Sequence, residues 1–159
     1  MNIPYLSLKR ITDMHAEEIQ QAVSDAVDSG WYLQGERIAR FEQEYAEYTG
    51  AKYCVSCANG LDALTMMILA YKEMGYLKDG DEVIVPANTY IATILAITEN
   101  NLKPVLVEPR IDTLQIDDSL IEDAISEKTK AIMIVHLYGY DAYTDKIGAI
   151  YKARSLLLL

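Results

Sequence analysis

The feature that most constrains the fold is a regular alternation of short apolar runs and helical segments, which continues from Lys52 to the end of the chain. Short apolar runs bounded by Gly, Pro, Asn or Asp predict strands. They occupy residues 53–57, 82–85, 104–107, 131–135 and 156–159. Segments with helical spacing separate them, at residues 60–74, 89–99, 117–125 and 144–153. Because such alternation is typical of βαβ units, we predict an α/β fold with a mainly parallel sheet and helices on both faces.

The first part of the chain shows helical periodicity without strands. Apolar residues recur with helical spacing in residues 13–29, and Gly30 is placed to end that helix. A second helix presents Ile38, Phe41 and other apolar residues on one face before Gly50. We therefore divide the chain into a helical segment, residues 1–50, and an α/β domain, residues 51–159.

Charge and hydropathy exclude two classes of partner. The 159 residues carry a net charge of -10, whereas a protein that binds nucleic acid presents a basic face to the phosphates. No apolar run approaches the roughly 20 residues that span a bilayer. Residues 1–10 are short, mixed and contain Pro4, which does not resemble a signal peptide. We expect a cytoplasmic protein that binds neither nucleic acid nor membrane.

Two cysteines, Cys54 and Cys57, form a Cys-x-x-Cys pair. Such a pair is typical of a redox couple or half of a zinc site. No second pair is present, and the two histidines, His15 and His136, lie far away in the sequence. We therefore predict two buried or half-buried free thiols, as suits a reducing compartment, and no metal site.

The most informative segment is Cys-Ala-Asn-Gly-Leu-Asp-Ala-Leu, residues 57–64, where a predicted strand turns into a predicted helix. The start of a helix presents free N–H groups and the positive end of the helix dipole, and both favour a bound phosphate. Gly60 allows close approach because it has no side chain. The alternative is an ordinary strand-to-helix turn in which Asn59 only caps the helix.

An ordered series of motifs carries a family resemblance along nearly the whole chain. The motifs are Ile3-Pro4-Tyr5-Leu6, Gly-Trp-Tyr-Leu-Gln-Gly at 30–35, Phe41-Glu42, Ala-Asn-Gly-Leu-Asp-Ala-Leu at 58–64, Gly-Asp-Glu-Val-Ile-Val-Pro at 80–86, Asn-Thr-Tyr-Ile-Ala-Thr at 88–93, Lys-Thr-Lys-Ala-Ile at 128–132 and His-Leu-Tyr-Gly at 136–139. In this order and spacing the chain resembles the DegT/StrS family of pyridoxal-phosphate-dependent sugar aminotransferases. The fold that the resemblance implies is the large domain of a fold-type-I aminotransferase.

The resemblance also implies roles for individual residues. The backbone of Gly60 and Leu61, next to Asn59, would hold the phosphate of the cofactor, pyridoxal 5'-phosphate. Tyr90 matches the aromatic position that stacks on the pyridine ring; without the resemblance, it reads as an aromatic packed into the core. His136 matches a residue that contacts substrate or cofactor, or it is a structural histidine held by hydrogen bonds.

For the activity, the resemblance implies transfer of an amino group from glutamate to a keto nucleotide sugar in amino-sugar and surface-polysaccharide biosynthesis. The Gly-Leu-Asp-Ala-Leu version at residues 60–64 resembles the branch that acts on 3-keto sugars. Members are expected to be homo-oligomers, in particular homodimers.

The family also needs a Schiff-base lysine and a carboxylate at the pyridine nitrogen. No lysine of this sequence has the serine- and aromatic-containing context of the family's lysine, so we assign no catalytic residue. We expect a truncated domain that is inactive alone. Two alternatives stay open: a non-catalytic fragment that only folds and dimerises, and an unrelated phosphate-binding α/β module.

Overall fold

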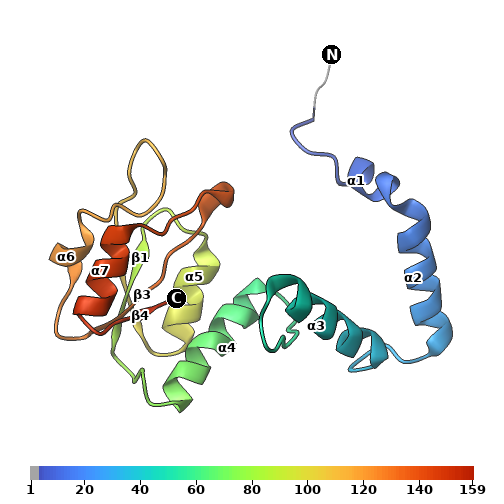
Figure 1. The fold of residues 1–159 in the computed structure, drawn as a ribbon, viewed down its shortest axis with the longest axis horizontal. Helices are drawn as coiled ribbons and strands as arrows, with labels where there is room; N and C mark the ends of the chain where they lie inside the picture. Colours follow the sequence, from blue (N-terminus) through green and yellow to red (C-terminus); the bar gives the residue numbers. More distant parts are fainter. Residues whose placement is uncertain (1–3) are drawn as a thin grey trace. The chain divides into compact units, whose positions relative to one another are not determined.

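The computed structural model describes residues 4–159, so that Ile3, the first residue of the motif series, lies outside it. The described chain forms two compact units that divide after Ser56, and each is described by itself. Figure 1 identifies their helices and strands along the chain.

The first unit is helical. It contains α1 (Leu8–Met14), α2 (Ala16–Ser29) and α3 (Glu36–Thr49). Gly30 and Gly50 follow α2 and α3 in the left-handed conformation, with φ of 65° and 72°, and their N–H groups close the last turns. Both predicted helices and their glycine stops are thus confirmed. The additional helix α1 begins at the cap Ser7, whose hydroxyl accepts a bond from the N–H of Arg10.

These three helices bury very little apolar surface. No residue of α1 or α2 is buried, and in α3 only Ala46 is. Large apolar side chains that repeat with helical spacing on α2 and α3 are exposed instead: Ile19, Val23, Val27, Phe41, Tyr45 and Tyr48. Within residues 4–56 the helices are therefore amphipathic but have no shared core.

The second unit is an α/β sheet domain. Along the chain it contains α4 (Gly60–Glu73), β1 (Glu82–Pro86), α5 (Ile91–Glu99), β2 (Lys103–Val107), α6 (Ile121–Ala124), β3 (Thr129–Ile132), the 3-10 turn η1 (Leu137–Gly139), α7 (Asp145–Ala153) and β4 (Leu157–Leu158). The strands form one sheet in the order β2-β1-β3-β4, and all pairs are parallel. The predicted fold class is confirmed.

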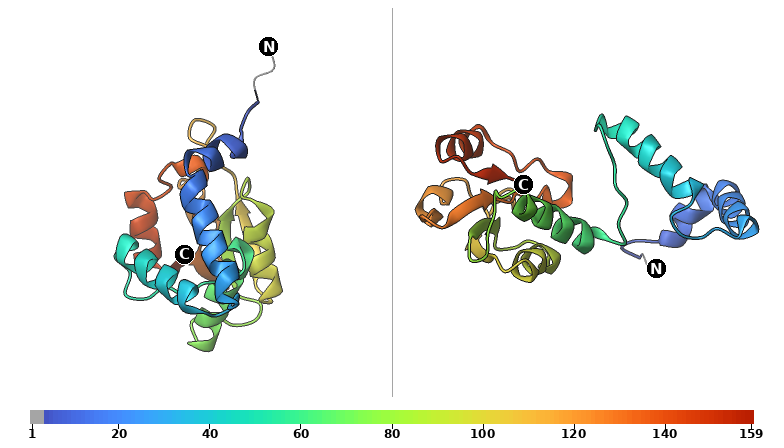
Figure 2. Two further views of the ribbon diagram at one scale, coloured as in Figure 1. Left: turned by 90° about the vertical axis from the view of Figure 1, so that its right-hand side faces the viewer. Right: turned by 90° about the horizontal axis from the view of Figure 1, so that it is seen from below.

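Helices cover both faces of this sheet, as predicted (Figures 1 and 2). Successive side chains of a strand point to opposite faces, so Val83 and Val85 of β1 enter one core while Ile84 enters the other. The first core includes Ile68 of α4 and Ile97 of α5. The second core includes Ile121 of α6 together with Ile147 and Ile150 of α7. Burial on both faces explains why these strands are continuous apolar runs.

The predicted strand at residues 53–57 is wrong for this structure. A strand needs a neighbour, but residues 51–58 make no backbone–backbone hydrogen bond within the described chain. Tyr53 and Val55 are consequently exposed. The apolar pattern predicted a strand because a pattern does not reveal whether a partner strand is present.

The predicted helix at residues 117–125 is shorter than expected, because α6 begins only at Ile121. The carboxylate of Asp117 binds the N–H of Ser119 at 2.9 Å and its hydroxyl at 2.6 Å, which closes a local turn instead of capping a helix. The predicted helix at 89–99 likewise begins at Ile91, with Tyr90 as its cap residue.

Candidate functional site

The candidate site lies where the parallel strands of the second unit end. Tyr90 follows β1 and His136 follows β3, and these two strands are neighbours in the sheet. Since the carboxyl ends of parallel strands meet at one edge, the loops that carry both residues emerge from the same edge, which we call the carboxyl edge. Ligand crevices of open α/β sheets form at this edge.

The first turn of α4 has two free backbone donors. Asn59 accepts the N–H of Asp62 on Oδ1 at 3.0 Å and donates from Nδ2 to the Asp62 carboxylate at 3.1 Å. The N–H groups of Gly60 and Leu61 have no hydrogen-bond partner among residues 4–159. The Asp62 carboxylate is held by Asn59 and does not cover these two donors. Asn59 therefore caps the helix, and the adjacent amides remain available to an anion.

Space is open at the side-chain position of Gly60. A Cβ built on Gly60 would meet no heavy atom within 4 Å. The side chain of Leu61, by contrast, packs against the core that α4 and α5 share. The residue therefore offers a ligand only its backbone, which agrees with the role expected for it.

Tyr90 does not pack into the core. Its residue surface is 76% exposed, and its carbonyl accepts the N–H of Thr93 in the first turn of α5. The alternative of a core aromatic is therefore wrong for this structure. An exposed ring beside the carboxyl edge is free to stack on a planar ligand.

His136 is held by a hydrogen bond and yet remains exposed. Its Nδ1 accepts the N–H of Ala142 at 3.0 Å, so the ring is held by a hydrogen bond. Its side chain is nevertheless 60% exposed, and Asp141 Oδ1 lies 3.4 Å from the same Nδ1. The imidazole is thus oriented by the backbone and still accessible to a ligand.

Sequence reasoning missed two polar residues that hold backbone segments in place. Glu42 Oε1 accepts both the N–H and the hydroxyl of Ser56 at 2.7 Å each, which tethers the extended segment that leads into α4. The Ser56 N–H, followed by its hydroxyl, holds the pKa of Glu42 below its usual value. The second residue, Gln115, is buried and binds the backbone of Leu137, next to His136. Neither partnership follows from a sequence pattern.

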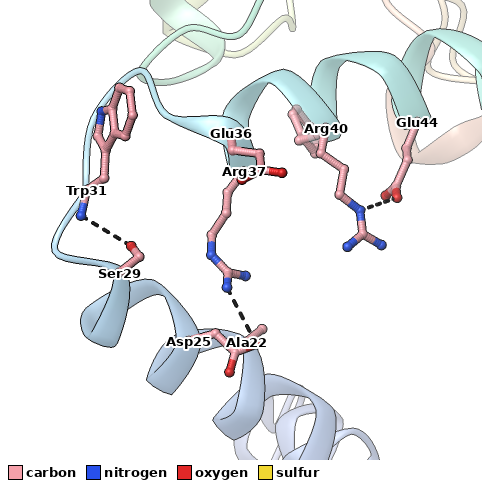
Figure 3. Close-up of a pocket in the computed structure, with 9 residues that line it drawn as sticks. Ala22, Asp25, Ser29, Trp31, Glu36, Arg37, Arg40 and Glu44 are labelled. Carbon is pink, nitrogen blue, oxygen red and sulfur yellow. Dashed lines mark hydrogen bonds and ion pairs between the residues drawn. The ribbon is translucent and has the colours of Figure 1, made fainter.

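The first unit contains a groove of its own, between α2 and α3 (Figure 3), with a volume of about 570 Å³. Its charged side chains pair with one another: Arg37 lies 3.5 Å from Asp25, and Arg40 lies 2.6 Å from Glu44. Trp31 lines the groove and donates from Nε1 to the carbonyl of Leu33. Because its cations are already paired, this groove is a weaker candidate for an anionic ligand than the start of α4.

Cys54 and Cys57 are free thiols, as predicted, although Cys57 is exposed and not half-buried. Among residues 4–159, no three His, Cys, Asp or Glu side chains are grouped to hold a metal ion. None of the helices in this part of the chain has the length and hydropathy needed to cross a bilayer.

Comparison with known proteins gives a consistent result. The sequence profile of the DegT/DnrJ/EryC1/StrS aminotransferase family matches residues 13–159. The chain is 51% identical over 157 residues to the dTDP-3-amino-3,6-dideoxy-alpha-D-galactopyranose transaminase of Aneurinibacillus thermoaerophilus, and the match covers 99% of this chain and 42% of that protein.

Solved structures of similar proteins share the fold. The crystal structure of S. venezuelae DesV in complex with a ketimine intermediate matches 98% of this chain and 41% of its own, with a TM-score of 0.88 and 38% identity. The structure of NtdA from Bacillus subtilis with bound cofactor PMP matches 99% of this chain and 35% of its own, with a TM-score of 0.90 and 31% identity. The chain thus spans less than half the length of each of these proteins. An unrelated phosphate-binding module is no longer a viable alternative.

Proposed function

Because the chain belongs to the DegT/DnrJ/EryC1/StrS aminotransferase family, we propose that it supplies the phosphate- and ring-binding part of a pyridoxal-phosphate-dependent sugar aminotransferase. The proposed reaction moves an amino group from glutamate to a keto nucleotide sugar in amino-sugar and surface-polysaccharide biosynthesis. The name of the Aneurinibacillus relative, a 3-amino sugar transaminase, supports a 3-keto sugar as the acceptor.

The observation that carries this proposal is the start of α4. A phosphate there would receive the N–H groups of Gly60 and Leu61, which the described chain leaves without partners. The open space beside Gly60 lets the phosphate approach the backbone. Asn59 satisfies the N–H of Asp62, so the cap and the phosphate would bind different donors. The residues present therefore fit the phosphate group.

The carboxyl edge would orient the rest of the cofactor. The exposed ring of Tyr90 is available to stack on the pyridine ring, and His136 would donate a hydrogen bond to the cofactor or the substrate. Pyridoxal phosphate, when bound, supplies an electron sink for the amino transfer. None of the lysines in this sequence has the family's context for the Schiff-base residue, and we expect no turnover by the 159-residue chain alone.

Titration of the 159-residue chain with pyridoxal phosphate, followed by calorimetry, tests the proposal. Gly60→Val adds a Cβ at a position with no heavy atom within 4 Å, so we expect the fold to be retained, which circular dichroism checks. Loss of charge-assisted hydrogen bonds should weaken binding by about one to two orders of magnitude. Pyridoxal without the phosphate should bind weakly to both forms, and inorganic phosphate should compete.

The same titration distinguishes the alternatives. Equal affinity of Gly60→Val and the unchanged chain would place the phosphate elsewhere and refute the cradle at α4. Borohydride reduction that labels one lysine covalently would refute our expectation that this chain lacks the Schiff-base residue. Tyr90→Ala is the companion variant, and it should weaken pyridoxal as well as pyridoxal phosphate, since it removes only the stacking surface.

We also propose that the protein forms a homo-oligomer and that it is located in the cytoplasm. Exposed apolar residues on α2 and α3, among them Val23, Phe41 and Tyr45, support a homo-oligomer because contiguous apolar surface favours association. They also favour the second candidate function, a chain that folds and dimerises without catalysis. Light scattering that shows a monodisperse monomer would contradict the homo-oligomer. The two free cysteines suit a reducing compartment, which supports the cytoplasm as the location.

A further inference from the structure

The turn that follows β3 has an unusual backbone. Tyr138 and Gly139 both adopt left-handed φ values, 57° and 80°. For a tyrosine this conformation is strained, and such strain persists only where the surroundings hold it. The Tyr138 ring is exposed and makes no hydrogen bond to residues 4–159, so it does not supply the restraint.

Backbone bonds within the turn supply part of the restraint, since the Leu137 N–H donates to the Val135 carbonyl at 2.8 Å and the Tyr140 N–H to the Leu137 carbonyl at 3.2 Å. Gln115, a buried residue in the loop after β2, adds a restraint from outside the turn. Its surface is only 7% exposed. Its Nε2 donates to the carbonyl of Leu137 at 3.2 Å, and its Oε1 accepts the N–H of Leu137 at 3.4 Å. One side-chain amide therefore gives a second partner to both backbone groups of Leu137, and it ties the turn to the loop after β2.

The same turn fixes the tautomer of the neutral His136 ring. An imidazole nitrogen that accepts a hydrogen bond carries no proton, so the bond from the Ala142 N–H to Nδ1 places the proton of the neutral ring on Nε2. Nε2 has no partner among residues 4–159, and the side chain is largely exposed. Asp141 Oδ1 lies 3.4 Å from Nδ1 but is itself an acceptor, so it does not bond to this nitrogen while Ala142 donates to it.

We propose that Gln115 is a positioning residue, which holds the turn after β3 so that His136 presents its Nε2–H as a hydrogen-bond donor at the carboxyl edge. A fixed donor selects a ligand with an acceptor oxygen, such as a carbonyl, phenolate or carboxylate oxygen. The identity of that ligand rests on the proposed function, whereas the positioning of the ring does not.

The chain offers a favourable test because His15 and His136 are its only histidines, one in each unit. Nitrogen-15 NMR correlations of the full chain, recorded at an alkaline pH, report the tautomer of each ring. We expect His136 to be the pure Nε2–H tautomer. In Gln115→Leu it should become an averaged mixture of tautomers, and exchange of the Ala142 amide should accelerate about tenfold or more. His15 should not change.

A matched control separates positioning from general loss of stability. Asn100 is a buried amide in the same unit that donates to the carbonyls of Thr65 and Ala96. Asn100→Leu should destabilise the unit but leave the His136 tautomer and the relative protection of Ala142 unchanged. Similar NMR changes in both variants, or none in Gln115→Leu, would overturn the proposal.

Two further measurements keep the outcome decisive. Gln115→Glu preserves size and the acceptor for the Leu137 N–H but removes the donor to its carbonyl, so it should also release His136 if Gln115→Leu does not fold. Addition of pyridoxal phosphate should shift the His136 Nε2 signal and not that of His15. A fixed tautomer without this shift would refute the contact in the proposed function while leaving the positioning role supported.

Discussion

The two units of this chain form helices by the same local rules but stabilise them differently. Helices α2 and α3 end at left-handed glycines and have clear amphipathic faces, yet none of their large apolar side chains is buried. Helices α4, α5 and α7 are also followed by left-handed residues, Gly75, Asn101 and Ser155, but their apolar faces fill two cores around a sheet.

An amphipathic sequence pattern therefore predicts a helix with an apolar face, but it does not show that this face is buried. Isolated helices of this length are marginal in water, so tertiary packing supplies most of the stability. Residues 57–159 contain that packing. Residues 4–56 depend on local caps and surface pairs, each of which contributes little. We therefore expect substitutions of equal chemistry to have unequal effects in the two units.

The largest contrast should come from a matched pair of isoleucines. Ile84 in β1 is fully buried, whereas Ile19 in α2 is 42% exposed. Ile84→Ala should lower the free energy of unfolding by about 2–5 kcal/mol, because a cavity remains in a packed core. Ile19→Ala should change it by no more than about 0.5 kcal/mol. Urea unfolding followed by circular dichroism measures both, and equal losses would show that the first unit has a core after all.

A smaller contrast should come from two helix caps. The hydroxyl of Thr144 accepts the N–H of Ile147 at 3.1 Å at the start of the packed helix α7. Ser7 accepts the N–H of Arg10 at 3.4 Å at the start of the exposed helix α1. Thr144→Ala should cost about 1 kcal/mol in the unfolding of the second unit, and Ser7→Ala should leave that transition unchanged. A cost for Ser7→Ala as large as that for Thr144→Ala would break the comparison.

The smallest effect should be a local, pH-dependent release of the tether between Glu42 and Ser56. Because the pKa of Glu42 is lowered in the folded chain, chiefly by the Ser56 N–H, the tether stabilises the structure above the ordinary glutamate pKa of about 4.3. It is lost as the pH falls through the lowered folded value. The amide chemical shift of Ser56 should follow that titration.

Glu42→Gln is the control for this titration, and in that variant the Ser56 shift should no longer follow the carboxyl group. The pKa of Asp79 in the second unit is also lowered, principally by its hydrogen bond from Lys72. Its titration should be the same with and without the Glu42 substitution. A change at Asp79 would mean that the tether acts on the second unit as a whole.

Local patterns predicted most of the fold. Apolar periodicity located the helices, and alternating strands and helices were enough for a parallel sheet with both faces covered. The errors share one cause, since they depend on partners distant in sequence. The run at 53–57 lacks a neighbour, and Asp117 prefers the hydroxyl and N–H of Ser119 to a helix start.

The candidate site was predictable only where a backbone feature defines it. The free donors at Gly60 and Leu61 follow from the start of a helix, which the sequence located correctly. Exposure of Tyr90 was not predictable, because an aromatic at a helix start occurs equally in cores. The contact of Gln115 with Leu137 spans 22 positions and depends on two loops meeting at one edge, which no local pattern records.

The two edge strands of the sheet, β2 and β4, differ in how readily a further strand can pair with them. On β2, the N–H of Lys103 donates to the carbonyl of Asp81. The backbone of the next residue, Pro104, therefore faces outward, and proline has no N–H to donate to a new strand. On β4, Leu159 is bonded to β3 and the backbone groups of Leu158 face outward, flanked by leucines. The proline removes one donor from the outer edge of β2, so a further strand should pair more readily beside β4 than beside β2.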